Sequence, residues 1–349
     1  MTIRWALLGT GRHADGRAAP QLKTAAGSVL AAVLSRDRAR GEAFAKKHGI
    51  AKVHISMDEL LRDRDIDALY DATPDGLHAP NAAAAAAAGK HILIEKPLAL
   101  SLAEGVASSA ACRRHGVKLG VVFQQRHDAV HQEARRLVLA GEIGDVVSAL
   151  VQLPLAVSSR SAAPQAAPTW RTDPAMRSGG IVMSIGDHAY DTLAYLLGQD
   201  IVEVSAFTDA TRDNPPDERA GGMLLHLSRG AIGYAYASFR TPYARRPFEI
   251  HGTKGSLILT NTYSYLIGAG EDATPSLELV NDKGRTVRHF PPSDCFRLEV
   301  EQFNRAIEGK GEPMTTAEDG LRALAITDAI YAAWRGGRVA KVADFMPRS

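Results

Sequence analysis

The segment Gly9-Thr10-Gly11-Arg12-His13-Ala14 directly follows a short apolar run, Ile3 to Leu8, and has the form G-x-G-x-x-A. An apolar run of this length that ends in a glycine turn is typical of a buried strand. Gly9 permits a tight turn, Gly11 lets the backbone approach a pyrophosphate, and Ala14 lets the next helix pack on the strand. The N-terminus of that helix attracts negative charge. The segment therefore predicts a phosphate-binding loop for a dinucleotide.

Strand-like and helix-like segments alternate around this loop through about residue 125. Such alternation indicates parallel strands joined by helical crossovers, so we predict an α/β Rossmann domain with a doubly wound parallel sheet at residues 1–125. The alanine run Ala82 to Ala88 is assigned to a helix, because alanine is the best helix former and Gly89 supplies a stop. The predicted strands are Ile3 to Leu8, Val29 to Leu34, Ala68 to Ala72, His91 to Ile94 and Val117 to Phe123, and the predicted helices include Arg38 to His48, Leu77 to Ala88 and Ser101 to His115.

Strand-like runs follow one another after Gly144, without long helices between them. This pattern predicts an α+β domain with a large, mainly antiparallel open sheet at residues 126–349. The predicted strands are Val146 to Leu153, Val202 to Thr208, Gly222 to Leu227, Ala231 to Ser238, Phe248 to Gly252, Ser256 to Leu259 and Leu277 to Val280. The predicted helices are Ser184 to Leu197, Cys295 to Ile307 and Thr316 to Trp334, the last two able to pack back on the first domain, and the predicted loops are Ser158 to Pro168 and Asp209 to Arg219.

The composition limits the class of partner. The 41 basic and 39 acidic residues of the 349-residue chain nearly cancel, so we expect neither a nucleic-acid nor a membrane partner. Cys112 and Cys295 lack metal-ligand spacing and cannot form a disulfide framework, so we expect no metal site and a reducing, cytoplasmic location. We expect no membrane span or signal segment either.

The end of the second predicted strand indicates which dinucleotide binds. An acidic residue there would bind the ribose 2′-hydroxyl of NAD, whereas a basic residue would accept the 2′-phosphate of NADP. Ser35 and Arg36 occupy the deciding positions, and Arg40 follows shortly after. A guanidinium pairs well with phosphate, so the sequence favours NADP. NAD remains the alternative, because Asp37 lies only two positions beyond Ser35.

Three further segments carry a family resemblance: Glu95-Lys96-Pro97, Ala72-Thr73-Pro74-Asp75-Gly76-Leu77-His78 and Trp170-Arg171. With the glycine loop, they make the chain resemble the Gfo/Idh/MocA family of sugar and polyol oxidoreductases over nearly its full length. Segments Phe248 to Leu257 and Thr316 to Gly320 are similar to the second domain of that family. The resemblance implies NAD(P)-dependent hydride transfer to or from a sugar, polyol or keto-sugar. It also implies a homodimer or homotetramer formed through the open sheet face of the second domain.

The resemblance also implies roles for individual residues. Lys96 matches the catalytic lysine of the family and follows a predicted strand at the sheet edge where ligands collect. The family turns this lysine toward the nicotinamide with a cis bond, so we predict a cis Lys96–Pro97 bond. The expected cofactor-binding residues are Gly9, Thr10, Gly11, Arg12, His13, Ser35, Arg36, Arg40, Thr73, Pro74, His78, Glu95, Lys96, Arg126, Trp170 and Arg171.

One departure from the family lies in the second domain. The family usually has an acidic residue, a histidine four positions later and an acid three positions after that. His188 and Asp191 match the last two, whereas Ser184 stands where the first acid is expected. Asp187 lies on the same face of the predicted helix and could replace the missing carboxylate, or it could only charge the helix end.

Hydride transfer also moves a proton on the substrate oxygen, so the site needs an acid/base group. We expect Lys96, His188 and Asp187 to form the catalytic set, and Lys96, Ser184, His188 and Asp191 to face the substrate. In this hypothesis Asp187 or Asp191 orients the imidazole of His188, and Ser184 only hydrogen-bonds the substrate. Two other functions stay open: a redox-cycling NAD-dependent glycosidase and a non-catalytic dinucleotide sensor, the latter suggested by Ser184.

Overall fold

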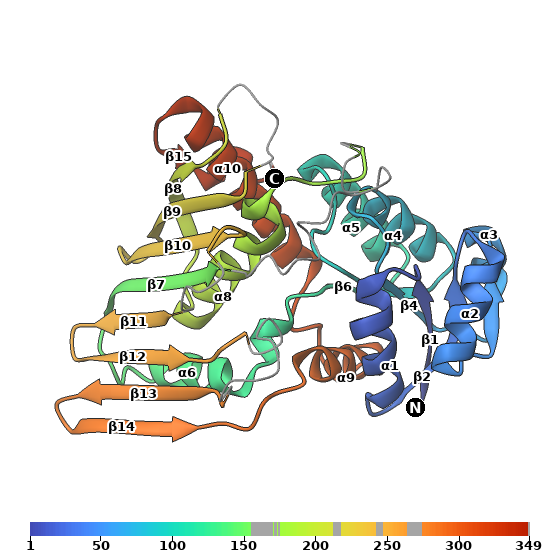
Figure 1. Cartoon of the computed structure of the whole chain (residues 1–349), viewed down its shortest axis with the longest axis horizontal. Coiled ribbons are helices and arrows are strands. Elements are labelled where there is room, and N and C mark those ends of the chain that lie inside the picture. The colour runs from blue at the N-terminus through green and yellow to red at the C-terminus, as the bar shows by residue number, and fades with distance from the viewer. Residues whose placement is uncertain are drawn as a thin grey trace.

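A computed structural model describes residues 1–154, 170, 173, 175–211, 218–241, 247–263 and 274–347. The described chain forms two sheets that lie side by side, with helices between them and around the first sheet (Figure 1). In the described part of the chain, no helix combines the length and the apolar character that crossing a membrane requires. The predicted loop Ser158 to Pro168 lies outside the described residues.

The first sheet contains six described strands, all parallel, in the order β3-β2-β1-β4-β5-β6. The order reverses between β1 and β4, and the crevice beyond the carboxyl ends of such a pair is where open α/β sheets bind ligands. The doubly wound parallel sheet is therefore confirmed. Its strands are β1 (Ile3–Leu8), β2 (Ser28–Leu34), β3 (Lys52–His54), β4 (Ala68–Asp71), β5 (His91–Ile94) and β6 (Leu119–Val121).

The helices of this half begin and end at residues that explain their bounds. Ser101 caps α5 and forms a capping box with Glu104, and Gly49 ends α2 in a left-handed conformation with a φ of 68°. The short strand β3 and helix α3 were not predicted, because segments this short carry no clear apolar period. The helical segments are η1 (Ala14–Ala18), α1 (Ala19–Thr24), α2 (Arg38–His48), α3 (Met57–Arg62), η2 (Asp75–Leu77), α4 (His78–Ala87) and α5 (Leu102–Arg114).

The second sheet contains nine described strands in the order β14-β13-β12-β11-β7-β10-β9-β8-β15. Only the pairing of β7 with β10 is parallel in the described part, which confirms a mainly antiparallel open sheet. Its strands are β7 (Val146–Pro154), β8 (Ile201–Thr208), β9 (Ala220–Leu227), β10 (Ile232–Ser238), β11 (Phe248–Gly252), β12 (Gly255–Thr260), β13 (Ser276–Asn281), β14 (Gly284–His289) and β15 (Ala340–Lys341).

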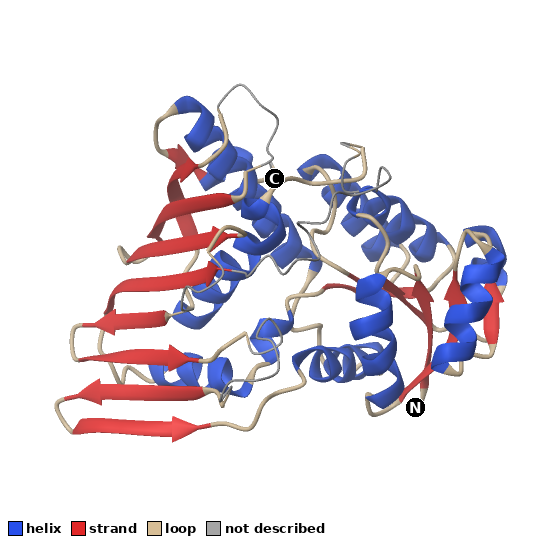
Figure 2. Cartoon of the chain, viewed as in Figure 1, coloured by secondary structure: helices blue, strands red, loops and turns tan. Residues whose placement is uncertain are grey.

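One face of this sheet is buried and the other is open. Side chains of alternate residues point to opposite faces, so residues paired across strands share a face. A single buried row crosses seven strands through Ala206, Met223, Ala235, Val151, Phe248, Leu259 and Leu277. Helices α6 (Ala129–Leu139), α8 (Asp187–Leu197) and part of α10 (Ala317–Gly336) cover that face, and α8 and α10 lie on the side toward the first sheet (Figure 2).

Helix α8 begins with an irregularity that its sequence did not indicate. The predicted segment Ser184 to Leu197 is preceded and opened by a π-helical turn, η5 (Val182–Gly186), before regular α-helix starts at Asp187. Single π-turns within helices occur frequently at functional sites. This turn carries Ser184, the residue that departs from the family pattern.

The two closing helices return to the first sheet, as the sequence suggested. The indole Nε1 of Trp5 in β1 donates to Asn304 of α9 (Cys295–Ile307) at 3.1 Å. The backbone N–H of Phe123 donates to Glu299 of α9 at 2.9 Å. Leu324 of α10 packs in the core of the first sheet, whereas Trp334 near the other end of α10 packs under the second sheet.

Candidate active site

A cavity of about 380 Å³ lies beyond the carboxyl ends of β1, β2 and β4. This is the position that the strand-order reversal predicts for a dinucleotide. Nine of the expected cofactor residues line it: Gly9, Thr10, Gly11, Ser35, Arg36, Arg40, Thr73, Pro74 and Trp170. Seven further lining residues were not predicted as site residues, namely Leu34, Ile55, Ser56, Met57, Ala72, Leu77 and Asn81. Ile55, Ser56, Met57 and Asn81 belong to segments without a recognisable motif. Arg171 lies outside the described residues.

The glycine loop has the geometry that a phosphate cradle requires. Gly9 has a φ of +98°, and a Cβ built there would lie 3.0 Å from the carbonyl oxygen of Ala72. A Cβ built on Gly11 would meet no atom within 4 Å, so this backbone faces open space. Gly9 is thus required by conformation and close contact, whereas Gly11 leaves room for a ligand to approach the backbone. These residues fit a dinucleotide.

The ribose end of the cavity carries basic side chains. Arg36 and Arg40 both line it. The carboxylate of Asp37, the residue that kept NAD as an alternative, caps helix α2 by accepting the backbone N–H of Arg40 at 2.8 Å. Ser35 is buried, and its hydroxyl donates to the backbone carbonyl of Asp37 at 2.8 Å. The strand end therefore presents guanidinium groups while its carboxylate is engaged by the helix.

A buried carboxylate fixes the floor of the cavity. Asp71 accepts hydrogen bonds from the backbone N–H and hydroxyl of Thr73, at 2.9 and 2.6 Å, and from the amide of Asn81 at 2.8 Å. His78 does not line the cavity, contrary to expectation: its ring nitrogens lie 2.7 Å from the carbonyl oxygen of Pro97 and 3.1 Å from that of Thr73. His78 therefore ties the cofactor loop to the segment after β5 by carbonyl contacts.

Lys96 is directed toward the second half of the chain. The Lys96–Pro97 bond is cis, as predicted. The ammonium of Lys96 donates to the backbone carbonyl of Ser184 and lies 3.4 Å from both carboxylate oxygens of Asp187. The Oγ of Ser184 is buried and makes no hydrogen bond with the described residues. Asp187 thus lies within reach of Lys96, and Ser184 engages Lys96 through its backbone.

Asp187 has unusual acidity for an aspartate. Burial raises its pKa to about 6, against the opposing effects of the Lys96 charge and of the His188 backbone N–H, which donates to Oδ1 at 2.8 Å. A carboxyl group with this pKa changes protonation within the range where many acid/base groups operate. The geometry favours the interpretation that Asp187 is a partner of Lys96 over the interpretation that it only places a charge at the helix end.

His188 is buried, and its ring makes no hydrogen bond or ion pair with a carboxylate of the described residues. Its Nδ1 is buried without a hydrogen-bond partner among the described residues, and the ring contacts Phe123 edge-on with centroids 6.5 Å apart. Burial first, and then the charge of Lys96, hold its pKa well below the usual value, so the imidazole is neutral. The expectation that Asp187 or Asp191 orients this ring is wrong, because each carboxylate faces a different cation.

Asp191 is held by Arg126. The guanidinium donates to the Asp191 carboxylate at 2.5 and 3.1 Å and to Asp319 at the start of α10 at 3.0 Å. Arg126 was expected to bind cofactor and Asp191 to face substrate. Both are buried and paired with each other, and neither lines the cavity, so the structure gives them the role of joining α8 to α10.

The remaining expected cofactor residues of the described chain, Arg12, His13, Glu95 and Lys96, do not line the cavity. Arg12 lies within the glycine loop and is exposed. His13 and Glu95 form an ion pair with Nε2 and Oε1 2.5 Å apart. Glu95 also accepts a hydrogen bond from the hydroxyl of Tyr70 at 2.7 Å. This pair was not foreseen, and it places two charged groups directly next to Lys96.

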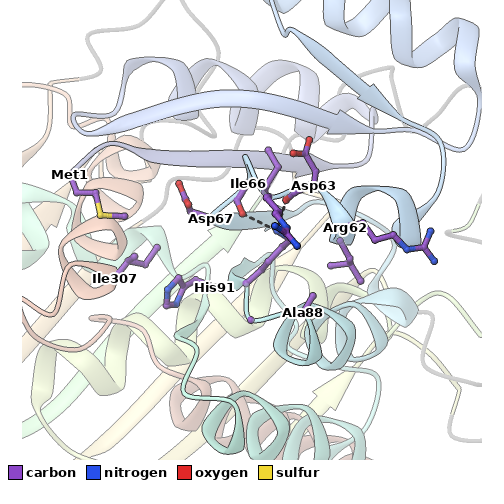
Figure 3. A pocket seen from close by; sticks show the side chains of 12 residues that line it. Met1, Arg62, Asp63, Ile66, Asp67, Ala88, His91 and Ile307 are labelled. Atoms are coloured by element: carbon purple, nitrogen blue, oxygen red, sulfur yellow. Dashed lines mark hydrogen bonds between the residues drawn. The ribbon is translucent and has the colours of Figure 1, made fainter.

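A second hollow, of about 640 Å³, lies at the opposite, amino-terminal end of the first sheet (Figure 3). Met1 and Ile307 lie at one end of it and Arg62 at the other. Its buried cation, Lys90, already donates to the backbone carbonyls of Asp63 and Ile66 at 2.8 and 2.9 Å. Because parallel sheets bind ligands at their carboxyl edge, this hollow is not the candidate site.

Comparison with known families agrees with this geometry. A model described as "Oxidoreductase family, NAD-binding Rossmann fold" matches residues 3–123, and one described as "GFO/IDH/MocA C-terminal domain" matches residues 131–258. The chain belongs to the Gfo/Idh/MocA family of oxidoreductases. Its family resemblance is thereby confirmed over both halves.

Members of the Gfo/Idh/MocA family with named activities are similar to this chain over most of its length. The 1,5-anhydro-D-fructose reductase of Ensifer adhaerens, whose motif spacing this sequence resembles, is 31% identical and the match covers 97% of this chain and 98% of the relative. The D-xylose 1-dehydrogenase (NADP(+)) 2 of Haloferax volcanii is 36% identical, with 86% and 88% covered. The crystal structure of aldose-aldose oxidoreductase from Caulobacter crescentus superposes with a TM-score of 0.85 at 26% identity, covering 98% of this chain and all of that one.

Proposed function

We propose that this chain catalyses NADP(H)-dependent oxidation or reduction of a sugar, polyol or keto-sugar. The observation that carries the proposal is the cluster of Lys96, Asp187 and His188, which joins the segment after β5 to helix α8. Lys96 follows β5 at the carboxyl edge of the first sheet, and the other two open helix α8 of the second half. The names of the relatives, a sugar reductase and a sugar dehydrogenase, support this substrate class.

Each of the three residues has a distinct task in this proposal. A nicotinamide bound in the cavity would supply the hydride to a carbonyl carbon in reduction or accept it from a carbinol carbon in oxidation. Lys96 donates a hydrogen bond to the substrate oxygen and stabilises the negative charge that develops on it. His188, neutral and with an unpartnered ring nitrogen, accepts the hydroxyl proton during oxidation and returns it during reduction. Asp187 holds the Lys96 ammonium in place with the Ser184 carbonyl.

The preference for NADP belongs to the same proposal. Arg36 and Arg40 line the cavity, and the Asp37 carboxylate is engaged as a helix cap. Guanidinium groups pair with a 2′-phosphate, whereas NAD recognition usually requires a carboxylate for the ribose hydroxyls. The family includes enzymes named for each cofactor, so the choice must rest on these side chains.

We also propose that the open face of the second sheet pairs with another copy of the chain. Phe207, Leu224 and Ile232 are 77%, 55% and 57% exposed on β8, β9 and β10. Leu224 is in register with Tyr234, which is in register with Leu150, so these side chains share the face opposite the buried row. A contiguous apolar patch of this kind on a soluble protein usually marks an interface. The resulting assembly would be a homodimer or homotetramer.

The expected cytoplasmic location is retained as a proposal. Cys112 and Cys295 are both buried free thiols in the described structure. Reduced, unpaired cysteines are typical of a reducing compartment.

The activity is tested with a panel of sugars, cyclic polyols and keto-sugars, following NADPH absorbance in both directions. Lys96→Ala and His188→Ala should each lower the rate about a hundredfold or more, the scale of a lost acid/base group. Ser184→Ala should do much less, because the contact with Lys96 comes from the backbone. No turnover with any member of the panel, together with retained cofactor binding, would favour the sensor; release of an aglycone with catalytic cofactor would favour the redox-cycling glycosidase.

A further inference from the structure

His13 and Glu95 connect the phosphate loop to the strand end that carries Lys96. His13 immediately precedes η1, and its Nε2 lies 2.5 Å from Oε1 of Glu95. The same carboxylate oxygen accepts the Tyr70 hydroxyl at 2.7 Å, and the His13 ring contacts Phe296 of α9 with centroids 5.7 Å apart. The Glu95 side chain is only 14% exposed, so it is an enclosed anion with two identified partners.

Glu95 and Lys96 are adjacent in sequence but face different surroundings. Along β5, Ile92 and Ile94 pack in one core cluster of the first sheet and Leu93 packs in the other. Glu95 continues the side of Leu93, and its partner Tyr70 packs in that same cluster. The side chain of Lys96 instead reaches the turn η5. Two consecutive opposite charges are therefore kept apart by two separate sets of partners.

We propose that His13 is a positioning residue whose positive charge neutralises Glu95 and so leaves the Lys96 ammonium to Asp187, the Ser184 carbonyl and the substrate. Without that charge, Lys96 is the other cation whose charge stabilises the Glu95 anion. The ammonium of Lys96 would then be drawn toward Glu95 and would release its proton less readily. The inference rests on the proposed function of Lys96, whereas the contacts of His13 with Glu95 are independent of that function.

The electrostatics of the pair agree with this assignment. Burial alone would raise the pKa of Glu95, but His13, the Tyr70 hydroxyl and Lys96 lower it to about 2. Burial tends to lower the pKa of His13, and the attraction of Glu95 outweighs it, so the pKa is raised. The other titratable groups that act on the pair are Arg17 of η1, Tyr70 of β4, Lys96 after β5, His188 of α8 and Glu299 of α9.

The sign of the pH dependence follows. Because the folded pKa of His13 lies above its ordinary value of 6.5, the imidazolium is the major form below that value. Its contribution is lost as the pH rises through the folded pKa. Above that point Glu95 keeps its negative charge without the imidazolium, and the ammonium of Lys96 becomes its main cationic partner.

The inference is tested without any turnover. Competitive labelling with acetic anhydride over a range of pH, read by mass spectrometry of the Lys96 peptide, gives the titration of Lys96 in the folded protein. In His13→Gln we expect the reactivity of Lys96 to be about tenfold lower at a given pH. His13→Lys, which restores a cation at a partly exposed position, should recover the original profile.

The matched control is His48→Gln. His48 makes the same kind of pair, with Nε2 2.8 Å from Oδ1 of Asp15, but away from Lys96. The His48→Gln substitution should leave the labelling profile of Lys96 unchanged. Histidine NMR of the unmodified protein, with the His13 signal assigned by its loss in His13→Gln, should give a midpoint above 6.5. An unchanged Lys96 profile in His13→Gln, or a His13 midpoint at or below 6.5, overturns the inference whether or not a sugar substrate is found.

Discussion

The ammonium of Lys96 lies 3.4 Å from the carboxylate of Asp187, a residue 91 positions further along the chain. The lysine follows strand β5 of the first sheet, and the aspartate opens helix α8 beneath the second. The pair therefore forms only when both halves are folded and docked. Asp187 lies three residues after the position where the family usually places its acid, and the π-turn η5 brings its carboxylate within reach of the lysine.

The first prediction concerns the pH profile of catalysis. Since the pKa of Asp187 is raised to about 6, the carboxylate is protonated below that pH and Lys96 loses its anionic partner. We expect kcat/KM to fall as the pH drops through about 6. Asp187→Asn should abolish this acid limb and lower the rate at pH 8 by an amount between the effects of Ser184→Ala and Lys96→Ala. If the acid limb of the kcat/KM profile persists unchanged in Asp187→Asn, Asp187 acts only as a charge at the end of the helix.

The second prediction concerns the cofactor. Arg36→Ala should weaken NADPH binding by roughly 10- to 150-fold, the value of one lost charge-assisted hydrogen bond of about 1.5–3 kcal/mol, and should hardly change NADH binding. Asp37→Ala serves as the comparison, because that carboxylate caps α2; it should lower the stability by about 1 kcal/mol and leave the NADPH preference intact. Dissociation constants from fluorescence titration decide. An unmodified protein that prefers NADH would show that Asp37 reads the ribose.

The third prediction concerns the contact that brings the second half over the cofactor loop. Ser178 donates to the Asp75 carboxylate from its hydroxyl at 2.6 Å and from its backbone at 3.2 Å. Gly76 lies against this segment, and a Cβ there would overlap the carbonyl oxygen of Ala175. Gly76→Ala should therefore separate the two segments and raise the NADPH dissociation constant roughly tenfold, the scale of a 1–3 kcal/mol overpacking cost.

Gly16→Ala is the control for that substitution. A Cβ on Gly16 would meet no atom within 4 Å, so the same added methyl group has room. It should leave cofactor binding unchanged. Equal dissociation constants for the two variants would mean that the contact at Gly76 does not govern binding.

The fourth prediction concerns a buried acid in the junction between α9 and β6. Glu299 accepts the Phe123 backbone N–H at 2.9 Å and the Thr315 hydroxyl at 3.1 Å, and burial raises its pKa well above the usual value. A carboxyl group with a raised folded pKa lowers the stability as the pH rises above the unfolded value. Glu299→Gln keeps an acceptor oxygen and removes this loss. Its Tm relative to the unmodified protein should thus be higher at pH 8 than at pH 5; the reverse order in thermal melts would contradict the assignment.

The fifth prediction concerns assembly. Leu224→Asp and Phe207→Asp should each reduce the mass measured by light scattering to that of one chain, because a buried unpaired carboxylate is costly at an apolar interface. Val29→Asp is the matched control, since Val29 is 47% exposed on a strand of the first sheet. A monomeric unmodified protein would remove the basis of this prediction.

The fold was largely predictable because its signals are local. Alternation of short apolar runs with helical segments predicted the first sheet, and β1, β5 and α2 have the predicted bounds. Strand β14 was not predicted, because it is exposed along its whole length and shows no apolar alternation. The two-residue strand β15 is recognised only by its pairing with β8.

The positions of site residues that belong to a sequence motif were predictable. The side-chain pairings between segments far apart in the sequence were not. The glycine loop and Lys96 fall where their motifs predict. The pairing of Arg126 with Asp191 joins separate elements, whereas the match to the family motif gave Asp191 a different role. The π-turn under Ser184 and the ion pair of His13 with Glu95 depend on three-dimensional packing that the sequence does not display.

The hydrogen bond from Trp5 to Asn304 joins residues 299 positions apart and has a consequence for biosynthesis. Helix α9 completes the core around β1 with Phe296, Val300 and Phe303. During synthesis the first sheet is therefore made before the helix that covers its apolar face. Contacts of such large sequence separation form slowly, and a sheet that waits with an apolar face exposed is prone to aggregate. We therefore expect a fragment ended near residue 125 to be insoluble by itself, and the nascent chain to depend on chaperones until its last helices are made.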